Sequence, residues 1–280
     1  MPELPEVETV VRYLASALPG RRIAAVWTSG ARLRAPVTRR ALVSAVGRTF
    51  VGVRRRGKYV LCDLDDGRAL LVHLGMSGHL VLEAASAHPT GCTASSLALP
   101  PHTHVLWRLD RGRLRFTDPR RFGLVRIGAR EFPEILRLGV DPLDAALTPE
   151  RLIALFRRTR RAIKDALLDQ TLVAGLGNIY ACEALHRAGL APRRRADRVR
   201  AGEAACLLAA MREVLAQAIE RRGTTLADRR YVGGDGREGE NLACLAVYDR
   251  EGAPCPRCAR AIVRIVQGAR STFLCRGCQR

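Results

Sequence analysis

Four cysteines near the C-terminus constrain the fold of this chain more than any other feature. Cys255 and Cys258 form one Cys-x-x-Cys pair, Cys275 and Cys278 form a second, and sixteen residues separate the pairs. Two residues between cysteines let both thiolates reach one ion, so the doubled spacing predicts a tetrahedral zinc site. Redox pairs and disulfides are the alternatives, but a redox motif is rarely doubled. Because cysteine fills all four positions, the predicted single zinc ion is structural and leaves no ligand position for a catalytic water.

The charge of the chain predicts a polyanionic partner. The 280 residues carry a formal charge of +20, which favours nucleic acid over a membrane surface. No apolar run approaches membrane-spanning length and no secretory signal precedes the first helix, so we expect a cytoplasmic protein. The segment Ala259–Leu274 between the cysteine pairs has hairpin texture and carries three arginines, which suits phosphate contacts. The remaining five cysteines are expected to be free thiols: Cys62, Cys92, Cys182, Cys206 and Cys244.

Hydrophobic periodicity predicts an α+β multidomain protein. Apolar residues at helical spacing from Val7 to Leu18 predict an N-terminal helix, and short strand-like runs from Ile23 to Ile127 predict a β-sandwich. Thr148-Pro149 suits a helix start, and Ala201–Arg222 has one apolar stripe. The predicted domains are a β-sandwich with flanking helices over 1–138, a helical domain over 149–222, a loop region over 223–246 and a zinc ribbon over 247–280. Within the loop region, Gly223–Leu242 is glycine-rich and polar and is predicted to be mobile.

The first residues suit amine chemistry. A small second residue permits removal of Met1, which would make Pro2 the N-terminal residue with a secondary amine. An α-amine has a pKa near 8, about two units below that of lysine, so its neutral, nucleophilic fraction is roughly a hundredfold larger. Glu3 stands beside it and can exchange protons. The alternative is an ordinary helix start, in which Glu3 and Glu6 interact favourably with the helix dipole.

Lysine is retained at only two of the 47 basic positions, Lys58 and Lys164. Arginine suffices wherever a positive charge alone is required. A retained lysine indicates a need for a compact ammonium or for an amine that can lose its proton. Compositional drift is the alternative explanation.

The chain resembles the bacterial formamidopyrimidine-DNA glycosylases, which excise 8-oxoguanine and ring-opened purines. The resemblance begins at MPELPEVETV and covers nearly the whole chain in order. The matching segments are RGKY around Lys58, HLGMSG at His73–Gly78, HTHV at His102–Val105, TDPRRFG at Thr117–Gly123, AIKDALLDQTLVAGLGNIYACEAL at Ala162–Leu185, GTTL at Gly223–Leu226 and QGARSTFLC before the last cysteine pair.

The resemblance implies a reaction and its residues. The amine of Pro2 would attack C1′ of the damaged nucleotide and form a Schiff base, with Glu3 as general acid/base. Lys58 would assist β-elimination, and Arg270 matches the arginine assigned to the second, δ-elimination. Phosphate positioning is the role that guanidinium chemistry best suits at Arg270.

The resemblance also implies the DNA contacts. The damaged base is flipped out and the vacated stack is filled by residues that match Met76, Arg120 and Phe122. Phosphate contacts are expected from residues that include glycine-flanked Asn178 in a helix–two-turn–helix motif. The full set of expected DNA contacts is His102, Arg120, Arg160, Lys164, Asn178 and Arg270.

Two departures from the family pattern bear on these expectations. The family commonly has Lys-Pro where this chain has Lys164-Asp165, and often an aromatic-Gln step where this chain has Glu240–Leu242. The resemblance implies that the loop region over 223–246 caps the flipped lesion, so the second departure bears on base preference. Two other functions are weighed: an endonuclease VIII-type glycosylase for oxidised pyrimidines, and a non-catalytic zinc-ribbon protein that binds damaged DNA. Leu4, Met76 and Phe122 favour the purine branch, and Pro2 with Glu3 and Lys58 favours an enzyme. With the resemblance we expect a monomer associated with the DNA of the bacterial nucleoid.

Overall fold

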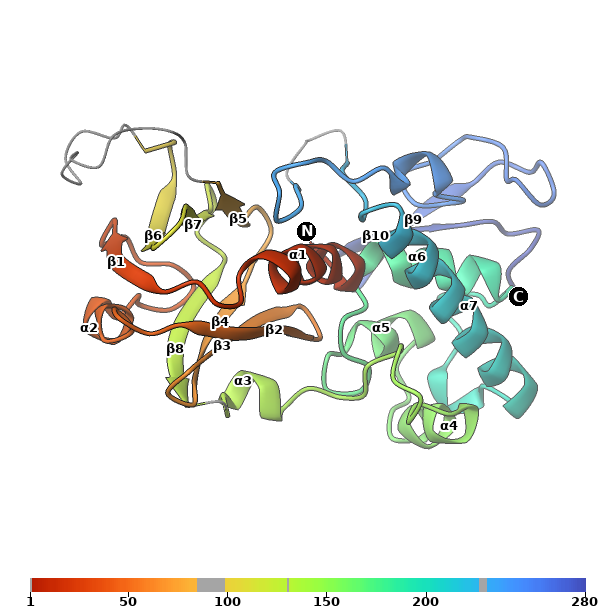
Figure 1. The fold of residues 1–280 in the computed structure, drawn as a ribbon. Helices are drawn as coiled ribbons and strands as arrows, with labels where there is room; N and C mark the ends of the chain where they lie inside the picture. Colours follow the sequence, from red (N-terminus) through yellow and green to blue (C-terminus); the bar gives the residue numbers. More distant parts are fainter. Residues whose placement is uncertain (1, 85–98, 130, 227–230) are drawn as a thin grey trace. The chain divides into compact units, whose positions relative to one another are not determined.

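The computed structural model describes residues 2–84, 99–129, 131–226 and 231–280, and Met1 and Cys92 lie outside these ranges. The chain divides into two compact units (Figure 1). The first unit contains Met1–Phe132 and Arg222–Glu240, and the second contains Pro133–Arg221 and Asn241–Arg280. The boundaries of the four predicted domains stay predictions.

The first unit contains two four-stranded antiparallel sheets, as the β-sandwich prediction requires. One sheet has the order β1-β6-β7-β5 and the other β2-β3-β4-β8. The strands are β1 Ile23–Thr28, β2 Phe50–Arg56, β3 Tyr59–Leu64, β4 Arg68–His73, β5 His79–Glu83, β6 Thr103–Leu109, β7 Arg113–Thr117 and β8 Leu124–Ala129.

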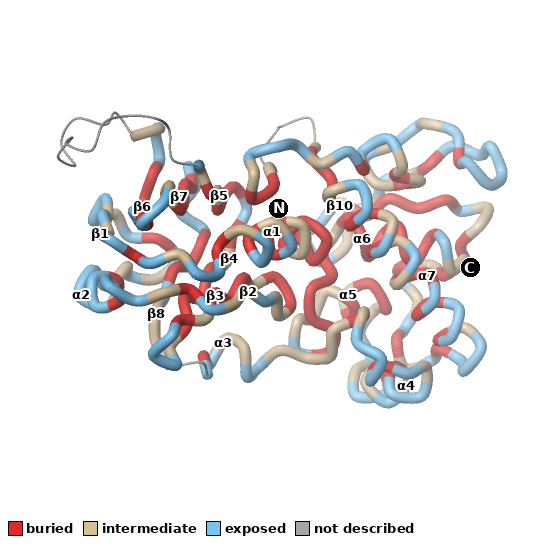
Figure 2. The backbone as a smooth tube through the Cα atoms, viewed as in Figure 1, coloured by how far each residue is buried: buried red, intermediate tan, exposed pale blue. Residues whose placement is uncertain are grey.

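The predicted N-terminal helix is α1, Leu4–Ala17. Its face of Val7, Val10 and Leu14 is fully buried and belongs to one hydrophobic core with residues of both sheets. Figure 2 shows buried and exposed residues alternating along α1, whereas β3 and β4 are mostly buried. Pro5 is tolerated here because the first turn of a helix has no internal partner for its backbone N–H groups.

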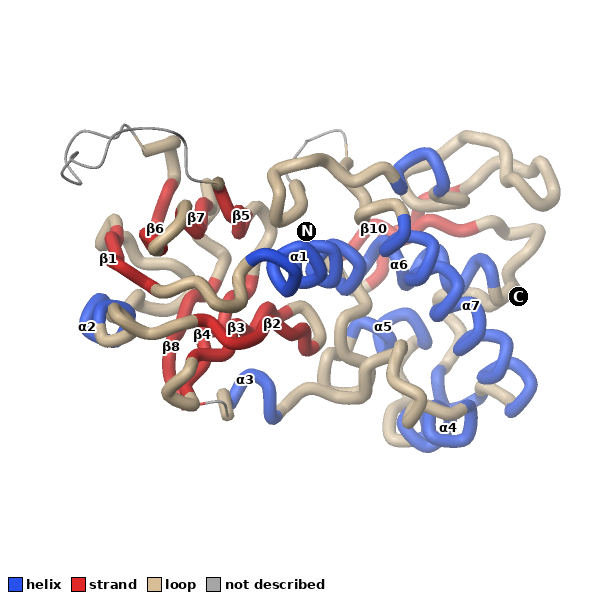
Figure 3. Tube along the Cα trace, viewed as in Figure 1, coloured by secondary structure: helices blue, strands red, loops and turns tan. Residues whose placement is uncertain are grey.

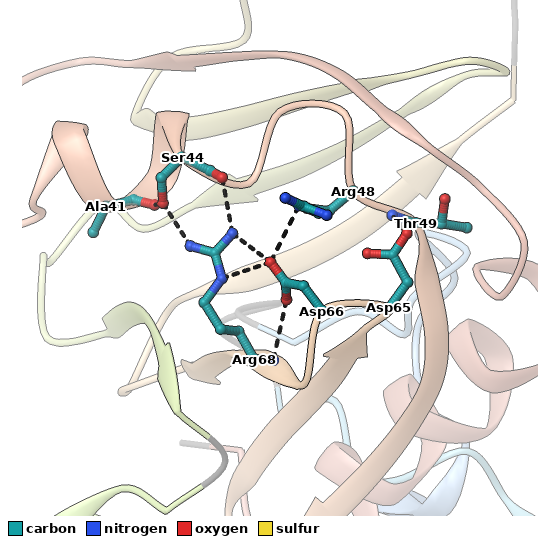
Figure 4. Close-up of polar contacts among 7 residues, drawn as sticks. All are labelled: Ala41, Ser44, Arg48, Thr49, Asp65, Asp66 and Arg68. Carbon is teal, nitrogen blue, oxygen red and sulfur yellow. Dashed lines mark hydrogen bonds and ion pairs between the residues drawn. The ribbon is translucent and has the colours of Figure 1, made fainter.

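A short helix, α2 (Arg39–Val43), is fixed to the β3–β4 turn by an arginine. Arg68 donates to the Ser44 hydroxyl at 2.6 Å and to the Ser44 carbonyl at 2.8 Å, and its Nε donates to Asp66 at 2.8 Å (Figure 4). Arg48 also pairs with Asp66 at 3.2 Å. In the same view, Thr49 N–H donates to Asp65 at 3.1 Å. These arginines stabilise the fold, so net charge alone does not identify DNA contacts.

The second unit is helical with a two-stranded hairpin, as Figure 3 shows. Its longest helix, α7, matches the predicted apolar stripe and is followed by a turn at Arg221. The described ranges contain no helix with the length and hydropathy needed to cross a bilayer. The elements are α3 Pro133–Leu136, α4 Pro149–Arg157, α5 Ile163–Leu168, α6 Asn178–Arg187, η1 Ala196–Arg198, α7 Ala201–Glu220, η2 Asn241–Cys244, β9 Val263–Gln267 and β10 Arg270–Leu274.

Candidate active site and nucleic-acid interface

The first unit holds the predicted catalytic N-terminus in a buried, hydrogen-bonded setting. Pro2 is buried and Glu3 is only 2% exposed. The carboxylate of Glu6 accepts from Glu3 N–H at 2.7 Å with one oxygen and from Thr224 N–H at 2.8 Å with the other. Glu6 thus connects the residue beside Pro2 to the GTTL segment. Sequence reasoning assigned Glu6 only a helix-dipole role, because its second contact lies 218 residues along the chain.

Lys58 lies at the tip of the β2–β3 hairpin and is only 7% exposed. The preceding Gly57 has a φ of 56°, which favours glycine. Arg55 donates to the Gly57 carbonyl at 3.1 Å and to Glu8 of α1 at 2.7 Å. Burial and two hydrogen bonds therefore fix the hairpin tip relative to the helix that begins beside Glu3.

His73, at the end of β4, carries a neutral ring at physiological pH. Burial, aided by the positive charges of Arg34 and Lys58, lowers the pKa of His73 to about 3. Its Nδ1 accepts from Gly75 N–H at 2.9 Å and contacts the Arg34 guanidinium at 3.1 Å. Because the ring stays neutral, it can accept hydrogen bonds without adding a positive charge near Lys58.

The three predicted void-filling residues are exposed and lie on two loops of the first unit. Met76 is 36% exposed and Phe122 is 44% exposed, which is unusual for large apolar side chains. The guanidinium carbon of Arg120 lies 4.8 Å from the centroid of the Phe122 ring. An exposed thioether, a ring and a stacked guanidinium form a surface that can insert between bases.

Asp118 joins these two loops, a role that sequence reasoning missed. It is fully buried, and one carboxylate oxygen accepts from the Ser77 hydroxyl at 2.7 Å and from Arg120 N–H at 3.2 Å. The other accepts from Gly123 N–H at 2.7 Å. Gly75 has a φ of 66°, and a Cβ there would lie 2.5 Å from the backbone carbon of Phe122. The loops are therefore held in one arrangement. Ser77 lies in HLGMSG and Asp118 lies in TDPRRFG, so both belong to motifs of the resemblance. Their contact was not predicted because the two residues are 41 positions apart.

His102 is exposed and has a φ of 61°, beside the start of β6. Its carbonyl accepts from Asp118 N–H at 3.0 Å. The next histidine, His104, is buried and contacts the Asp118 carbonyl at 3.0 Å through Nε2. Asp118 therefore also fixes the segment that presents His102 to solvent.

The second unit brings three predicted residues together at the zinc hairpin. Lys164 is fully buried, and its Nζ donates to Thr272 Oγ1 at 2.5 Å and to the Ser271 carbonyl at 3.3 Å. Asn178 also donates to the Ser271 carbonyl, at 2.9 Å. Arg270, the residue before Ser271, is exposed. Lys164 and Asn178 thus support the strand that carries Arg270. Arg160 is exposed in the segment between α4 and α5.

The four cysteines lie in one cluster at the hairpin. Their sulfurs all lie within 4.8 Å of one another, with Cys255–Cys278 at 3.8 Å and Cys258–Cys275 at 3.3 Å. Four thiolates bound to one zinc at about 2.3 Å are about 3.8 Å apart, so the residues fit the ion. His186 Nε2 lies 3.4 Å from Cys255 Sγ, and Arg257 N–H donates to the same sulfur at 3.4 Å. N–H groups near thiolates offset the negative charge of a four-cysteine site. The prediction of one structural zinc ion is confirmed, because the four cysteines are arranged as such a site requires.

Up to Glu240, the described parts of the Gly223–Leu242 region belong to the first unit and are hydrogen-bonded to it. Tyr231 donates to the Glu6 and Arg222 carbonyls at 3.1 and 3.0 Å. Burial raises the pKa of Tyr231 well above its usual value, so the hydroxyl remains a donor. Residues 227–230, part of the predicted mobile loop, lie outside the described ranges. In Glu240–Leu242, where the chain departs from the family pattern, Asn241 is buried and Leu242 is 44% exposed.

Comparisons with known proteins match all three parts of the chain. Residues 1–125 match the formamidopyrimidine-DNA glycosylase N-terminal domain, 138–230 the H2TH domain of that family, and 252–280 a zinc finger found in FPG and IleRS. A formamidopyrimidine-DNA glycosylase from Paracoccus denitrificans is 46% identical over 285 residues, and one from Gluconobacter oxydans is 44% identical over 287. Each match covers 100% of both chains.

Solved structures give the same result. The MutM (Fpg) protein from Thermus thermophilus matches with a TM-score of 0.85 and 41% identity, over 99% of this chain and 98% of that one. A Lactococcus lactis FPG variant in complex with DNA containing Fapy-dG matches with a TM-score of 0.86 and 29% identity, over 99% of both chains.

Proposed function

The chain belongs to the formamidopyrimidine-DNA glycosylase family, and from this premise we propose which of its residues carry out the reaction. As a member it is a DNA glycosylase and abasic-site lyase of base-excision repair, and its partner is damaged duplex DNA. The observation that supports our residue assignment most is the buried Pro2–Glu3 start of α1, held by Glu6. We place the enzyme in the cytoplasm, with the nucleoid DNA that it repairs.

The N-terminus supplies the nucleophile and its proton partner. After removal of Met1, the neutral secondary amine of Pro2 attacks C1′ of the flipped nucleotide. A bond forms between nitrogen and C1′, the glycosidic bond breaks, and the departing base takes up a proton. Glu3 exchanges the protons as the sugar ring opens and the iminium forms. Burial of Glu3 excludes bulk water from this exchange.

The iminium is an electron sink for the elimination steps. It acidifies C2′, and loss of that proton expels the 3′ phosphate. We assign proton transfer in this step to Lys58, whose amine can lose its proton, whereas arginine remains charged. Arg270, exposed on the hairpin, binds the remaining phosphate as it leaves in the second elimination.

The substrate that we propose is an oxidised purine. The solved relative from Lactococcus lactis binds DNA containing Fapy-dG, a ring-opened purine. In this chain the exposed Met76 and Phe122, with Arg120 stacked on the ring, fill the gap left by the flipped nucleotide. His102, Arg160, Lys164 and Asn178 are assigned to binding or supporting contacts with the DNA backbone.

Borohydride trapping tests the assignment. The protein is mixed with duplex DNA containing 8-oxoguanine opposite cytosine, and in parallel with thymine glycol duplex, in the presence of borohydride. We expect a covalent cross-link on the 8-oxoguanine duplex, with the adduct mapped to Pro2 by peptide mass spectrometry. A protein that retains Met1 should form no adduct while still binding abasic DNA. Absence of a cross-link under conditions that trap a known lyase would refute the function, and preference for thymine glycol would place the chain with oxidised-pyrimidine glycosylases.

A further inference from the structure

We propose that Asp165 is a positioning residue that fixes the tip of the zinc hairpin and thereby orients Arg270 for the second elimination. The inference rests on the proposed function of Arg270. It concerns a carboxylate that the reaction itself does not use, placed directly after Lys164. Contacts within the second unit support it.

The hairpin turn fixes Arg270 through the residue opposite it. Strand β9 ends at Gln267, strand β10 begins at Arg270, and these two residues are paired across the strands. The turn between them is Gly268-Ala269, with φ values of 54° and 59°. Positive φ at both central residues is the geometry of a tight two-residue hairpin turn. Any restraint on Gln267 is therefore transmitted to Arg270 through two backbone positions.

Asp165 supplies that restraint. Gln267 Nε2 donates to Asp165 Oδ2 at 3.2 Å and to the Pro192 carbonyl at 3.2 Å. A carboxylate and a carbonyl can only accept, so they determine which way the amide points. Gln267 Oε1 is buried and has no hydrogen-bond partner within the described part of the chain. A flipped amide would turn Oε1 toward these two acceptor oxygens and lose both hydrogen bonds, so the two acceptors keep the amide in its observed orientation.

The turn also lies beside the carboxylate. A Cβ placed on Gly268 would lie 3.1 Å from Asp165 Oδ1. One carboxylate oxygen of Asp165 is thus close enough to the turn to crowd any side chain at position 268, while the other accepts from Gln267.

Lys164, the preceding residue of α5, holds the other strand. Its ammonium donates to Thr272 and to the Ser271 carbonyl, the two residues that follow Arg270. Consecutive residues in the first turn of α5 therefore bind β10 just after Arg270 and β9 just opposite it. The backbone around Arg270 is fixed while its guanidinium remains exposed. A fixed guanidinium reaches its phosphate at a lower entropic cost than one on a mobile tip.

The ratio of δ-elimination to β-elimination products on abasic duplex DNA tests this role. Asp165→Ala should lower the ratio about tenfold, since small misplacements of a positioned group reduce rates strongly. Asp165→Asn, which retains an acceptor oxygen, should lie between the alanine variant and the wild type. Borohydride trapping at Pro2 and bound zinc should stay at wild-type levels. Glu213→Ala, which removes an exposed carboxylate from the same unit, controls for net charge.

Hydrogen exchange gives a readout that does not depend on activity. Amide exchange at Gly268–Ser271 should accelerate in Asp165→Ala, and Gln267→Ala should produce the same change. The double variant should show little further effect, because both substitutions break one contact.

An unchanged product ratio in Asp165→Ala would overturn the proposal. Equal loss of trapping and of δ-elimination, or the same loss in Glu213→Ala, would also overturn it. A wild-type protein that forms no adduct would instead refute the proposed function, while hydrogen exchange would still decide whether Asp165 holds the turn.

Discussion

The two lysines occupy different chemical settings. Lys58 lies at a buried hairpin tip in the unit that carries Pro2, whereas the ammonium of Lys164 is fully buried and donates to Thr272 and Ser271. The sequence predicted that both positions need lysine and that Lys164 binds phosphate. The phosphate contact stays a prediction. The structure adds an internal role for Lys164 that no local pattern reveals, because its partner Thr272 lies 108 residues away.

We expect Lys58→Arg to reduce strand cleavage about a hundredfold while changing affinity for abasic DNA less than about threefold. Arginine keeps the charge but not the exchangeable proton, and removal of a general acid or base typically costs about two to four orders of magnitude. Single-turnover cleavage and equilibrium binding measure the two effects. Intact turnover in this variant would show that charge alone is needed at position 58.

Lys164→Arg should behave differently. A larger guanidinium must enter a fully buried site, and overpacking costs about 1–3 kcal/mol. The thermal transition of the second unit should fall by several degrees and DNA affinity should weaken, with a smaller effect on cleavage of bound substrate. Differential scanning calorimetry and the same binding assay measure this. Unchanged stability would contradict the assigned internal role.

At the scale of elements, patterning predicted most of the framework. Short strand-like runs from Ile23 to Ile127 predicted the strands of the two sheets, and the apolar stripe predicted α7. The short helix α2 was not predicted, because its attachment depends on Arg68 of the β3–β4 hairpin. Likewise, the void-filling loops were identified by their motifs, but the buried Asp118 that joins them required tertiary contacts.

The junction of these loops gives a test at Gly75. In Gly75→Ala, a Cβ would lie 2.5 Å from the Phe122 backbone, and the positive φ adds strain. We expect affinity for abasic duplex to fall about tenfold, while affinity for undamaged duplex stays within about twofold, because only insertion into the stack is affected. Gly202→Ala, whose Cβ meets nothing within 4 Å, is the matched control. Equal losses on both duplexes would indicate a general folding defect.

The β5–β7 sheet edge has an acid-sensitive ion pair. Burial raises the pKa of Glu83, but hydrogen bonds and charges from Arg113 and Arg115 outweigh it, so the pKa lies below its usual value of 4.5. A lowered folded-state pKa contributes stability that is present above 4.5 and is lost as pH falls through the folded value. Glu83→Gln should therefore reduce the fall in denaturation midpoint between about pH 7 and about pH 3. The same pH dependence of the denaturation midpoint in wild type and variant would show that the ion pairs of Glu83 contribute little to stability.

At the scale of the whole molecule, net charge predicted the partner but not the contacts. Many arginines are used inside the fold: Arg212 donates to the carbonyls of Pro142, Asp144 and Leu147, and Arg55 and Arg68 bind carboxylates. The exposed candidate Arg160 was identified only through the resemblance, whereas Arg270 was also one of the three arginines expected from the hairpin texture. A single sequence does not distinguish an arginine that binds the protein's own carbonyls from one that binds DNA, since both need the same guanidinium.

Zinc removal separates the contributions of the two units. The zinc ribbon has a small core, with Val247, Ile262 and Phe273 packed beside two of the ligand cysteines, too little apolar surface to fold without the ion. The catalytic N-terminus lies in the other unit, which has its own larger core. Chelation should therefore unfold the hairpin and leave the first unit folded.

We expect the chelated protein to lose at least about tenfold in affinity for abasic duplex, because Arg270 and the hairpin no longer contact phosphate. Far-UV circular dichroism should still show the thermal transition of the first unit. Added zinc should restore binding and magnesium should not, because a site of four thiolates disfavours hard cations. Cys206→Ser, an exposed cysteine outside the cluster, should keep wild-type zinc content and affinity. Wild-type affinity in the zinc-free protein would mean that the hairpin adds nothing to DNA binding, and that Arg270 acts, if at all, after the complex has formed.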